Sequence, residues 1–160
     1  TYVKTKSWYP TGSDGVLRLA DTPYGRIGAA ICFDMDFPAF IHGLGRLGAD
    51  IVLVPAYDTE RIRPYHTEAG LMRALENGFS VVRQTSHGTS MAIDGSGRVL
   101  ARQEYFETDD RLLLADVPTR RLATPYAALG EWFAYAAMAA AVALVAAGAI
   151  RGRRGGVPRS

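Results

Sequence analysis

The chain has 160 residues, of which 48% are hydrophobic and 21% are charged, and its formal net charge at pH 7 is +2. This composition is ordinary for a folded protein, and the sequence has no basic patch interleaved with aromatic residues, which argues against a nucleic acid as partner. The single cysteine excludes an intrachain disulfide, and the three histidines have no metal-ligand spacing, so we expect no metal and no cofactor.

The first third of the chain is predicted to lead from an irregular segment into strands and a helix. The first 25 residues are expected to be irregular, because turn signals fill the segment 10–15. Apolar residues predict a strand at about 26–31, and after a sharp turn a helix follows at about 37–47. The apolar run Ile51–Val54 predicts a buried strand.

The middle of the chain is predicted to hold a helix followed by several strands. Residues 64–77 form the helix, with Pro64 in its first turn and Gly78 just beyond its end. The later strands are expected at 80–84, 89–93, 98–102 and 112–114, with a hairpin turn at 94–97. Strands that alternate with helices before a run of strands indicate an α/β fold.

The last part of the chain contains a long segment without charge. Residues 132–150 are 19 residues long, and as a helix they would span roughly 28 Å, about the thickness of a bilayer core. Interfacial aromatics, Trp132 and Tyr135, stand at one end, and three arginines follow the other end at Arg151, Arg153 and Arg154. We expect a transmembrane helix whose basic end is cytoplasmic. The alternative is an alanine-rich helix buried in a soluble assembly, since 10 of the 19 residues are alanine.

Cys32 stands where the first apolar strand gives way to a turn and a helix. A cysteine in such a turn can project its sulfur from a sheet edge and lie near a helix N-terminus, where a thiolate is favoured. The competing interpretation is that Cys32 is a small buried hydrophobic residue, the usual environment of a free cysteine.

The residues around Cys32 form a longer pattern. The stretch Gly25–Asp34, with Phe37-Pro38 and Arg46–Pro55 after it, resembles the nucleophile segment of the nitrilase superfamily, the carbon-nitrogen hydrolases. Further motifs resemble the apolipoprotein N-acyltransferase branch of that superfamily: Tyr2-Val3-Lys4, His66, Arg73-Ala74, Glu76-Asn77-Gly78, Val82-Arg83, Thr85-Ser86, Thr124-Pro125-Tyr126 and Gly130–Phe133.

This resemblance implies a fold and a division into domains. The expected fold is the C-terminal part of a nitrilase-type α-β-β-α sandwich followed by one transmembrane helix. Residues 1–121 would belong to the catalytic domain and residues 122–131 would link it to the membrane. Residues 132–150 would span the membrane, and residues 151–160 would form a basic cytoplasmic tail. The chain is expected to be a C-terminal piece of a longer protein.

The resemblance also implies a Glu-Lys-Cys site. Cys32 would be the nucleophile and Lys4 would support the tetrahedral intermediate, with Lys6 as a competing candidate. The glutamate base would lie upstream, so this piece alone is expected to be inactive. A further glutamate of the family pattern is replaced by the Ser13-Asp14 region.

The resemblance implies supporting roles for other residues. The supporting residues implied are Phe33, Asp34, Arg73 and Glu76, of which Arg73 and Glu76 could either pair with each other or brace the site. A lone histidine is more often structural, so His66 and His87 are weaker candidates for a Cys-His pair.

Three functions remain open at this stage. The first is a membrane-bound acyltransferase, in which Cys32 takes a fatty acyl group from a phospholipid and passes it to the N-terminal amine of a lipoprotein. This enzyme would lie in the cell (inner) membrane, with its catalytic domain on the extracytoplasmic face. The second is a membrane-tethered amidase that uses the same thioester chemistry. The third is a non-catalytic relative.

Overall fold

The computed structural model describes residues 16–154. The chain divides after Ala128 into two compact units. Lys4 and Lys6, together with the Ser13-Asp14 region, lie outside the described residues.

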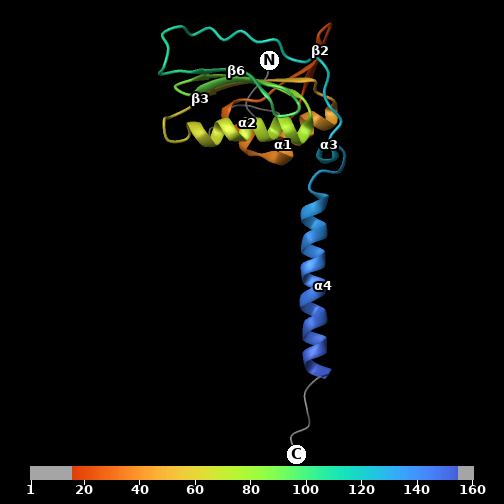
Figure 1. Ribbon diagram of the computed structural model, residues 1–160. Helices are drawn as coiled ribbons and strands as arrows, with labels where there is room; N and C mark the ends of the chain where they lie inside the picture. The colour runs from red at the N-terminus through yellow and green to blue at the C-terminus, as the bar shows by residue number, and fades with distance from the viewer. Residues whose placement is uncertain (1–15, 155–160) are drawn as a thin grey trace, which may run out of the picture. The chain divides into compact units, whose positions relative to one another are not determined.

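The first unit is built on a single six-stranded sheet (Figure 1). The inner strands β2, β3 and β4 run parallel, and the remaining neighbours pair antiparallel. The strands follow one another across the sheet in chain order: β1 Leu19–Thr22, β2 Gly25–Ala29, β3 Ile51–Tyr57, β4 Ser80–Ser86, β5 Thr89–Ile93 and β6 Val99–Glu104. The mixed sheet with its crossover helices confirms the predicted α/β class.

Two helices provide the crossovers between the parallel strands. Helix α1 spans Pro38–Leu47 and helix α2 spans Arg63–Asn77, and each has a proline in its first turn. Proline fixes a helical φ and loses no intrahelical hydrogen bond there. Each helix ends at a glycine in the left-handed conformation, Gly48 or Gly78. The sequence signals for the start and the end of α2 are therefore confirmed.

The core lies between these helices and one face of the sheet (Figure 1). Ile41 and Leu44 of α1 and Ala74 of α2 pack against alternate strand residues, including Val52, Val54, Val81 and Met91. The opposite face of β3 and β4 exposes Leu53, Pro55, Tyr57 and Gln84. Buried and exposed positions therefore alternate along the inner strands. Three of the four residues exposed on the second face are apolar or aromatic.

Two sequence-based expectations about strands were wrong. Residues 19–22, expected to be irregular, form β1, because the turn at Pro23-Tyr24 allows them to pair antiparallel with β2. The segment 112–114 is not a strand; Leu112 is 63% exposed and Leu114 is 79% exposed. An apolar triplet forms a strand only when a sheet edge pairs with it, and residues 112–114 pair with none of the six strands.

The segment after β6 is held to the sheet by hydrogen bonds rather than by strand pairing. The Ser80 hydroxyl donates to the carbonyl of Pro118, and the Leu122 N–H donates to the carbonyl of Gly78 at 2.7 Å. This segment leads into the short helix α3, Pro125–Leu129.

Helix α4, Trp132–Arg154, makes up most of the second unit. Its window Trp132–Ala149 has a mean hydropathy of 1.8, and none of this window is buried. Within residues 16–154 it is the one helix that is long and apolar enough to cross a bilayer.

Candidate active site

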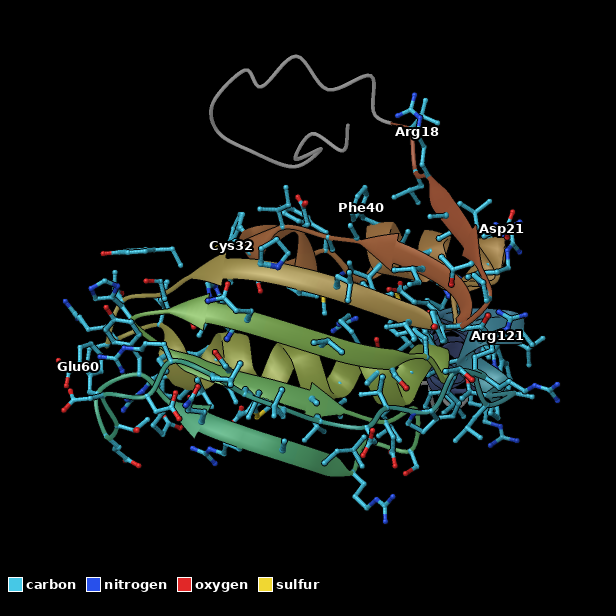
Figure 2. The ribbon with its side chains drawn as sticks, turned by 90° about the horizontal axis from the view of Figure 1, so that it is seen from above. Arg18, Asp21, Cys32, Phe40, Glu60 and Arg121 are labelled. Atoms are coloured by element: carbon cyan, nitrogen blue, oxygen red, sulfur yellow. The ribbon has the colours of Figure 1, made fainter. Side chains whose placement is uncertain are left out.

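Cys32 lies at the edge of the sheet where the parallel strands end. It follows β2, while Asp58 directly follows β3 and His87 directly follows β4. Figure 2 shows Cys32 and Glu60 near one end of the sheet, with Asp21 and Arg121 at the other end. Sites in α/β proteins form at the carboxyl ends of parallel strands, because loops from neighbouring strands meet there.

The backbone of Cys32 is in the left-handed region, with φ of 50°. This conformation costs a residue with a Cβ about 1–2 kcal/mol, so it persists only where surrounding contacts impose it. Two contacts do so here: the Ile31 N–H donates to Asp34 Oδ2 at 3.0 Å, and the Cys32 thiol donates to the Tyr57 carbonyl at 3.5 Å. Cys32 also begins the short 3-10 helix η1, Cys32–Asp36. The sulfur is thereby placed on a strained turn between a strand and a helix.

A chain of charged groups lies beside the sulfur. His66 of α2 donates from Nδ1 to Asp58 Oδ1 at 2.8 Å, and Arg83 of β4 donates to Asp58 Oδ2 at 2.7 Å. On its other side, His66 Nε2 is 3.3 Å from Asp36 Oδ2. Arg83 also donates to the Thr89 carbonyl at 2.8 Å. These residues join η1, α2 and two strands into one polar cluster, which we call the His66 cluster: His66, Asp58, Asp36 and Arg83.

The environment of the His66 cluster shifts the pKa of two members. Burial on its own would raise the pKa of Asp58, but hydrogen bonds from His66 and Arg83 and the positive charge of Arg83 outweigh burial and lower it. The hydrogen bond to Asp58 raises the pKa of His66 against the opposing effect of burial, and the negative charge of Asp36 adds to the increase. The cluster therefore favours an ionised Asp58 and a protonated His66.

These pKa shifts predict that the free energy of unfolding falls both at acidic pH and at alkaline pH. The pKa of folded Asp58 lies below its ordinary 3.8, so its contribution is present above that pH and is lost as the pH falls through the folded value. The pKa of folded His66 lies above 6.5, so its contribution is complete below pH 6.5 and is lost as the pH rises through the folded value. The cluster should stabilise the fold most between these two limits.

His66→Gln tests the alkaline limit of this window. The variant should lose roughly 1–3 kcal/mol of stability at about pH 6, the usual cost of leaving a buried hydrogen-bonding group without its partner. It should show less decline towards about pH 9 than the native protein. Denaturant unfolding of the full chain in detergent, followed across this pH range, measures both. Parallel curves for the two proteins would contradict the assigned linkage.

Cys32 and two members of the His66 cluster offer donor atoms that a metal ion could use. A donor atom from each of Cys32, Asp58 and His66 lies within 4.8 Å of the others. However, the Asp58 oxygens already accept from His66 and Arg83, and His66 Nδ1 is used in the same contact. Metal binding would break these bonds and place a cation next to Arg83, so the donor set suits a hydrogen-bonded cluster better than a metal site.

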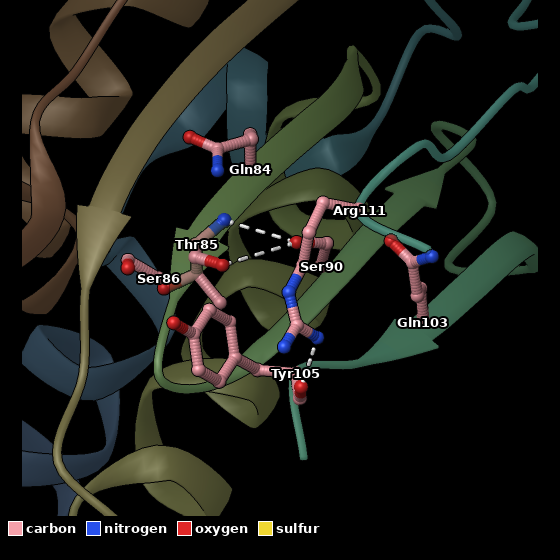
Figure 3. A pocket seen from close by; sticks show the side chains of 7 residues that line it. All are labelled: Gln84, Thr85, Ser86, Ser90, Gln103, Tyr105 and Arg111. Carbon is pink, nitrogen blue, oxygen red and sulfur yellow. Dashed lines mark hydrogen bonds between the residues drawn. The ribbon is translucent and has the colours of Figure 1, made fainter. Parts of the chain in front are cut away.

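A shallow cavity of about 240 Å³ is lined largely by residues of β4, β5 and β6. Its lining is mostly polar (Figure 3): Gln84, Thr85, Ser86, Ser90, Gln103, Tyr105 and Arg111. Ser90 accepts a hydrogen bond from the Thr85 N–H at 3.0 Å, and Arg111 lies over the Tyr105 ring at 4.1 Å from its centroid. Within the described part of the chain, the buried Thr85 hydroxyl has no hydrogen-bond partner.

The other site residues expected from sequence fall into two places. Phe33 and Asp34 follow Cys32 within η1, and buried Asp34 accepts from the Ile31 N–H through its carboxylate. Arg73 and Glu76 pair with each other on α2 at 2.5 Å. The Glu76 carbonyl also accepts from the Thr124 hydroxyl, so this pair lies near the segment that leads to α3. The catalytic lysine remains a prediction, because Lys4 is outside the described residues.

Sequence reasoning did not identify Asp58, named Arg83 only as part of the Val82-Arg83 motif, and ranked His66 low. Two signals could have found them. Asp58 follows a buried parallel strand, as Cys32 does, which places both at one sheet edge. Arg83 lies two residues after Val81 in a central strand, on the side of the strand that is buried, and a buried charge needs a partner of opposite sign. The contact between α2 and these strands joins residues distant in the chain, which sequence spacing does not reveal.

Comparison with known proteins places this geometry in a family. Residues 1–125 match the carbon-nitrogen hydrolase family model. The chain belongs to the carbon-nitrogen hydrolase family, which confirms the expected membership of the nitrilase superfamily. The solved structure of Nit3 from Saccharomyces cerevisiae, described as a member of the nitrilase superfamily, matches with a TM-score of 0.52 at 26% identity, covering 55% of this chain and 36% of that one.

The curated relatives include both a hydrolase and an acyltransferase. The probable hydrolase nit2 of Schizosaccharomyces pombe is 32% identical over 115 residues, which cover 65% of this chain and 42% of that protein. The apolipoprotein N-acyltransferase of Shewanella oneidensis is 31% identical over 110 residues, which cover 66% of this chain and 21% of that protein. The chain therefore spans less than half of each of these relatives.

Proposed function

We propose that this chain is part of a membrane-bound N-acyltransferase that uses Cys32 as its nucleophile. The observation that carries the proposal is the combination of a strained cysteine turn with an apolar helix in one chain. Helix α4 exposes Val142, Leu144 and Val145 along an 18-residue uncharged window. Such a surface is unfavourable in water and suits the interior of a bilayer. The likeness to an apolipoprotein N-acyltransferase supports this choice of reaction.

The proposed reaction has two steps that pass through a thioester. The Cys32 thiolate attacks the ester carbonyl of a phospholipid, the carbon–oxygen bond breaks, and the lysophospholipid leaves as an alcohol after taking a proton. The N-terminal amine of a lipoprotein then attacks the thioester carbonyl. The carbon–sulfur bond breaks, an amide forms, and the amine loses a proton while the thiol is restored.

A membrane location fits both proposed substrates, since the phospholipid and the lipid-modified acceptor both lie in the bilayer. The sequence places Arg151, Arg153 and Arg154 after the apolar window. Cytoplasmic flanks are enriched in Lys and Arg. We therefore place the end of α4 in the cytoplasm and the Cys32 site on the extracytoplasmic face of the cell membrane.

The experiment that tests the proposal is mass spectrometry of the full-length protein in phospholipid vesicles. We expect a fatty acyl mass on the peptide that contains Cys32, its absence in Cys32→Ser, and its transfer to a synthetic diacylated lipopeptide. His42→Gln is the matched control, because His42 contacts Asn77 and Tyr126 rather than the His66 cluster. This variant should keep the adduct.

The same experiment distinguishes the alternatives. A thioester discharged only to water or small amines would indicate a membrane-tethered hydrolase, in line with the likeness to the probable hydrolase nit2. If no adduct forms on Cys32 of a folded protein, a non-catalytic relative becomes the better description.

A further inference from the structure

His66 joins the three elements that surround Cys32. The histidine belongs to α2, its Nδ1 contacts Asp58 beyond β3, and its Nε2 is 3.3 Å from Asp36 at the end of η1. Both partners are carboxylates, which accept hydrogen bonds and do not donate them when ionised. The Nδ1 contact is a hydrogen bond of 2.8 Å, and the Nε2 contact is within ion-pair distance. A ring that faces a carboxylate at each nitrogen is favoured as an imidazolium, which carries a proton on both nitrogens and a positive charge.

The balance of charge in the His66 cluster favours the same state. The charged groups around the ring are Asp58 after β3, Asp36 in η1 and Arg83 on β4, where the Arg83 guanidinium reaches the ring through Asp58. With a protonated ring, the two cations balance the two anions, whereas a neutral ring leaves one net negative charge. Asp58 and Arg83 are almost fully buried, and an uncompensated charge there is costly.

This cation lies close to the proposed nucleophile. A nitrogen of His66 and an oxygen of Asp58 both lie within 4.8 Å of the Cys32 sulfur, so the charge of a protonated ring offsets the Asp58 carboxylate there. Positive charge near a cysteine favours its reactive thiolate form. Asp36 also closes η1, the helix that Cys32 begins, so the contact with His66 bears on both the charge and the position of the sulfur.

We infer that His66 is a positioning residue for Cys32: held as an imidazolium between Asp58 and Asp36, it fixes the strained turn and supplies positive charge beside the sulfur. The inference rests on Cys32 being the nucleophile of the proposed function and does not depend on the acyl donor or acceptor. The role of His66 is separate from that of the lysine expected from the resemblance, because His66 is anchored by α2.

The test is the pH profile of Cys32 alkylation by iodoacetamide in the full-length protein. The rate is quantified by mass spectrometry on the peptide that contains Cys32. In His66→Gln, the rate near pH 7 should fall at least about tenfold, because the thiolate loses a neighbouring cation. At about pH 10, where thiols ionise without help, the two rates should converge.

Convergence at high pH separates the inferred role from general damage. A purely structural defect would slow alkylation at every pH, whereas the loss of a charge slows it only where the thiol is protonated. His42→Gln should follow the native profile, because its contacts with Asn77 and Tyr126 lie outside the His66 cluster. A His66→Gln profile identical to the native one, or parallel to it at all pH values, would overturn the inference.

A second measurement uses the native protein, so it remains informative even if the His66→Gln variant does not fold. Ring-nitrogen NMR of the full-length protein in detergent should show both nitrogens of His66 protonated at about pH 7. A neutral ring with a single N–H at that pH would overturn the inference as well. Neither result depends on the acyl adduct, so the inference and the proposed function can fail separately.

Discussion

Replacing Arg83 by methionine is expected to destabilise the first unit by about 3–5 kcal/mol, the usual effect of removing one partner of a buried ion pair. Asp58 is fully buried and Arg83 is 2% exposed. The methionine would leave the Asp58 carboxylate with one hydrogen-bond donor fewer and no neighbouring guanidinium, and the Thr89 carbonyl would also lose its donor. Denaturant unfolding of the full chain in detergent at about pH 7 measures the loss.

Arg98→Met is the matched control for this change. Arg98 pairs with Asp94 at 3.2 Å, but its side chain is 73% exposed, and exposed pairs contribute about 0–1 kcal/mol. The double variant Arg83→Met with Asp58→Asn should be less destabilised than the sum of the two single variants, because it removes the unpaired charge. Equal losses from Arg83→Met and Arg98→Met would show that the buried pair is not a main support of the fold.

Gly78→Ala is expected to have the second large effect, and Gly97→Ala a smaller one. Both glycines have positive φ, 75° and 82°, so each alanine should cost about 1–2 kcal/mol in backbone strain. At Gly78 a Cβ would also lie 2.1 Å from the Leu122 carbonyl oxygen, whereas at Gly97 its nearest neighbour is 3.6 Å away. The clash should add about 1–3 kcal/mol at Gly78 alone.

The clash at Gly78 has a local consequence that can be measured separately. The Gly78 carbonyl accepts from the Leu122 N–H, so displacing residues 118–124 breaks this bond. Limited proteolysis should therefore cut this segment faster in Gly78→Ala than in Gly97→Ala or the native protein. Equal unfolding midpoints and equal cleavage rates for the two variants would contradict the close approach at Gly78.

Local sequence signals predicted a helix or a strand where the residues of that element alone determine where it begins and ends. Pro64 lies in the first turn of α2 and Gly78 lies just beyond its end, and the apolar run Ile51–Val54 predicts β3. The same logic failed at 112–114, where three leucines have strand character but no partner strand. It also missed β1, since residues 19–22 become a strand through pairing with β2.

Only the part of the candidate site that lies in the segment around Cys32 could be predicted from the sequence. The strand, turn and helix around Cys32 could be inferred from neighbouring residues, and the supporting roles of Phe33 and Asp34 stay predictions. The His66 cluster could not be inferred, because its four members come from four separate segments brought together by the packing of α2 on the sheet. Electrostatic environment is a property of that packing, and therefore pKa shifts such as those of Asp58 and His66 lie beyond sequence patterns.

The left-handed backbone of Cys32 bears on how such a protein can change over evolutionary time. Glycine would adopt φ of 50° without steric cost, so a lineage selected for folding alone could relax the turn by one substitution. A cysteine at this position lowers the stability of the fold relative to glycine, but it places a sulfur at the sheet edge. The sulfur at the sheet edge is therefore held at a cost in backbone energy that a glycine at this position would not carry.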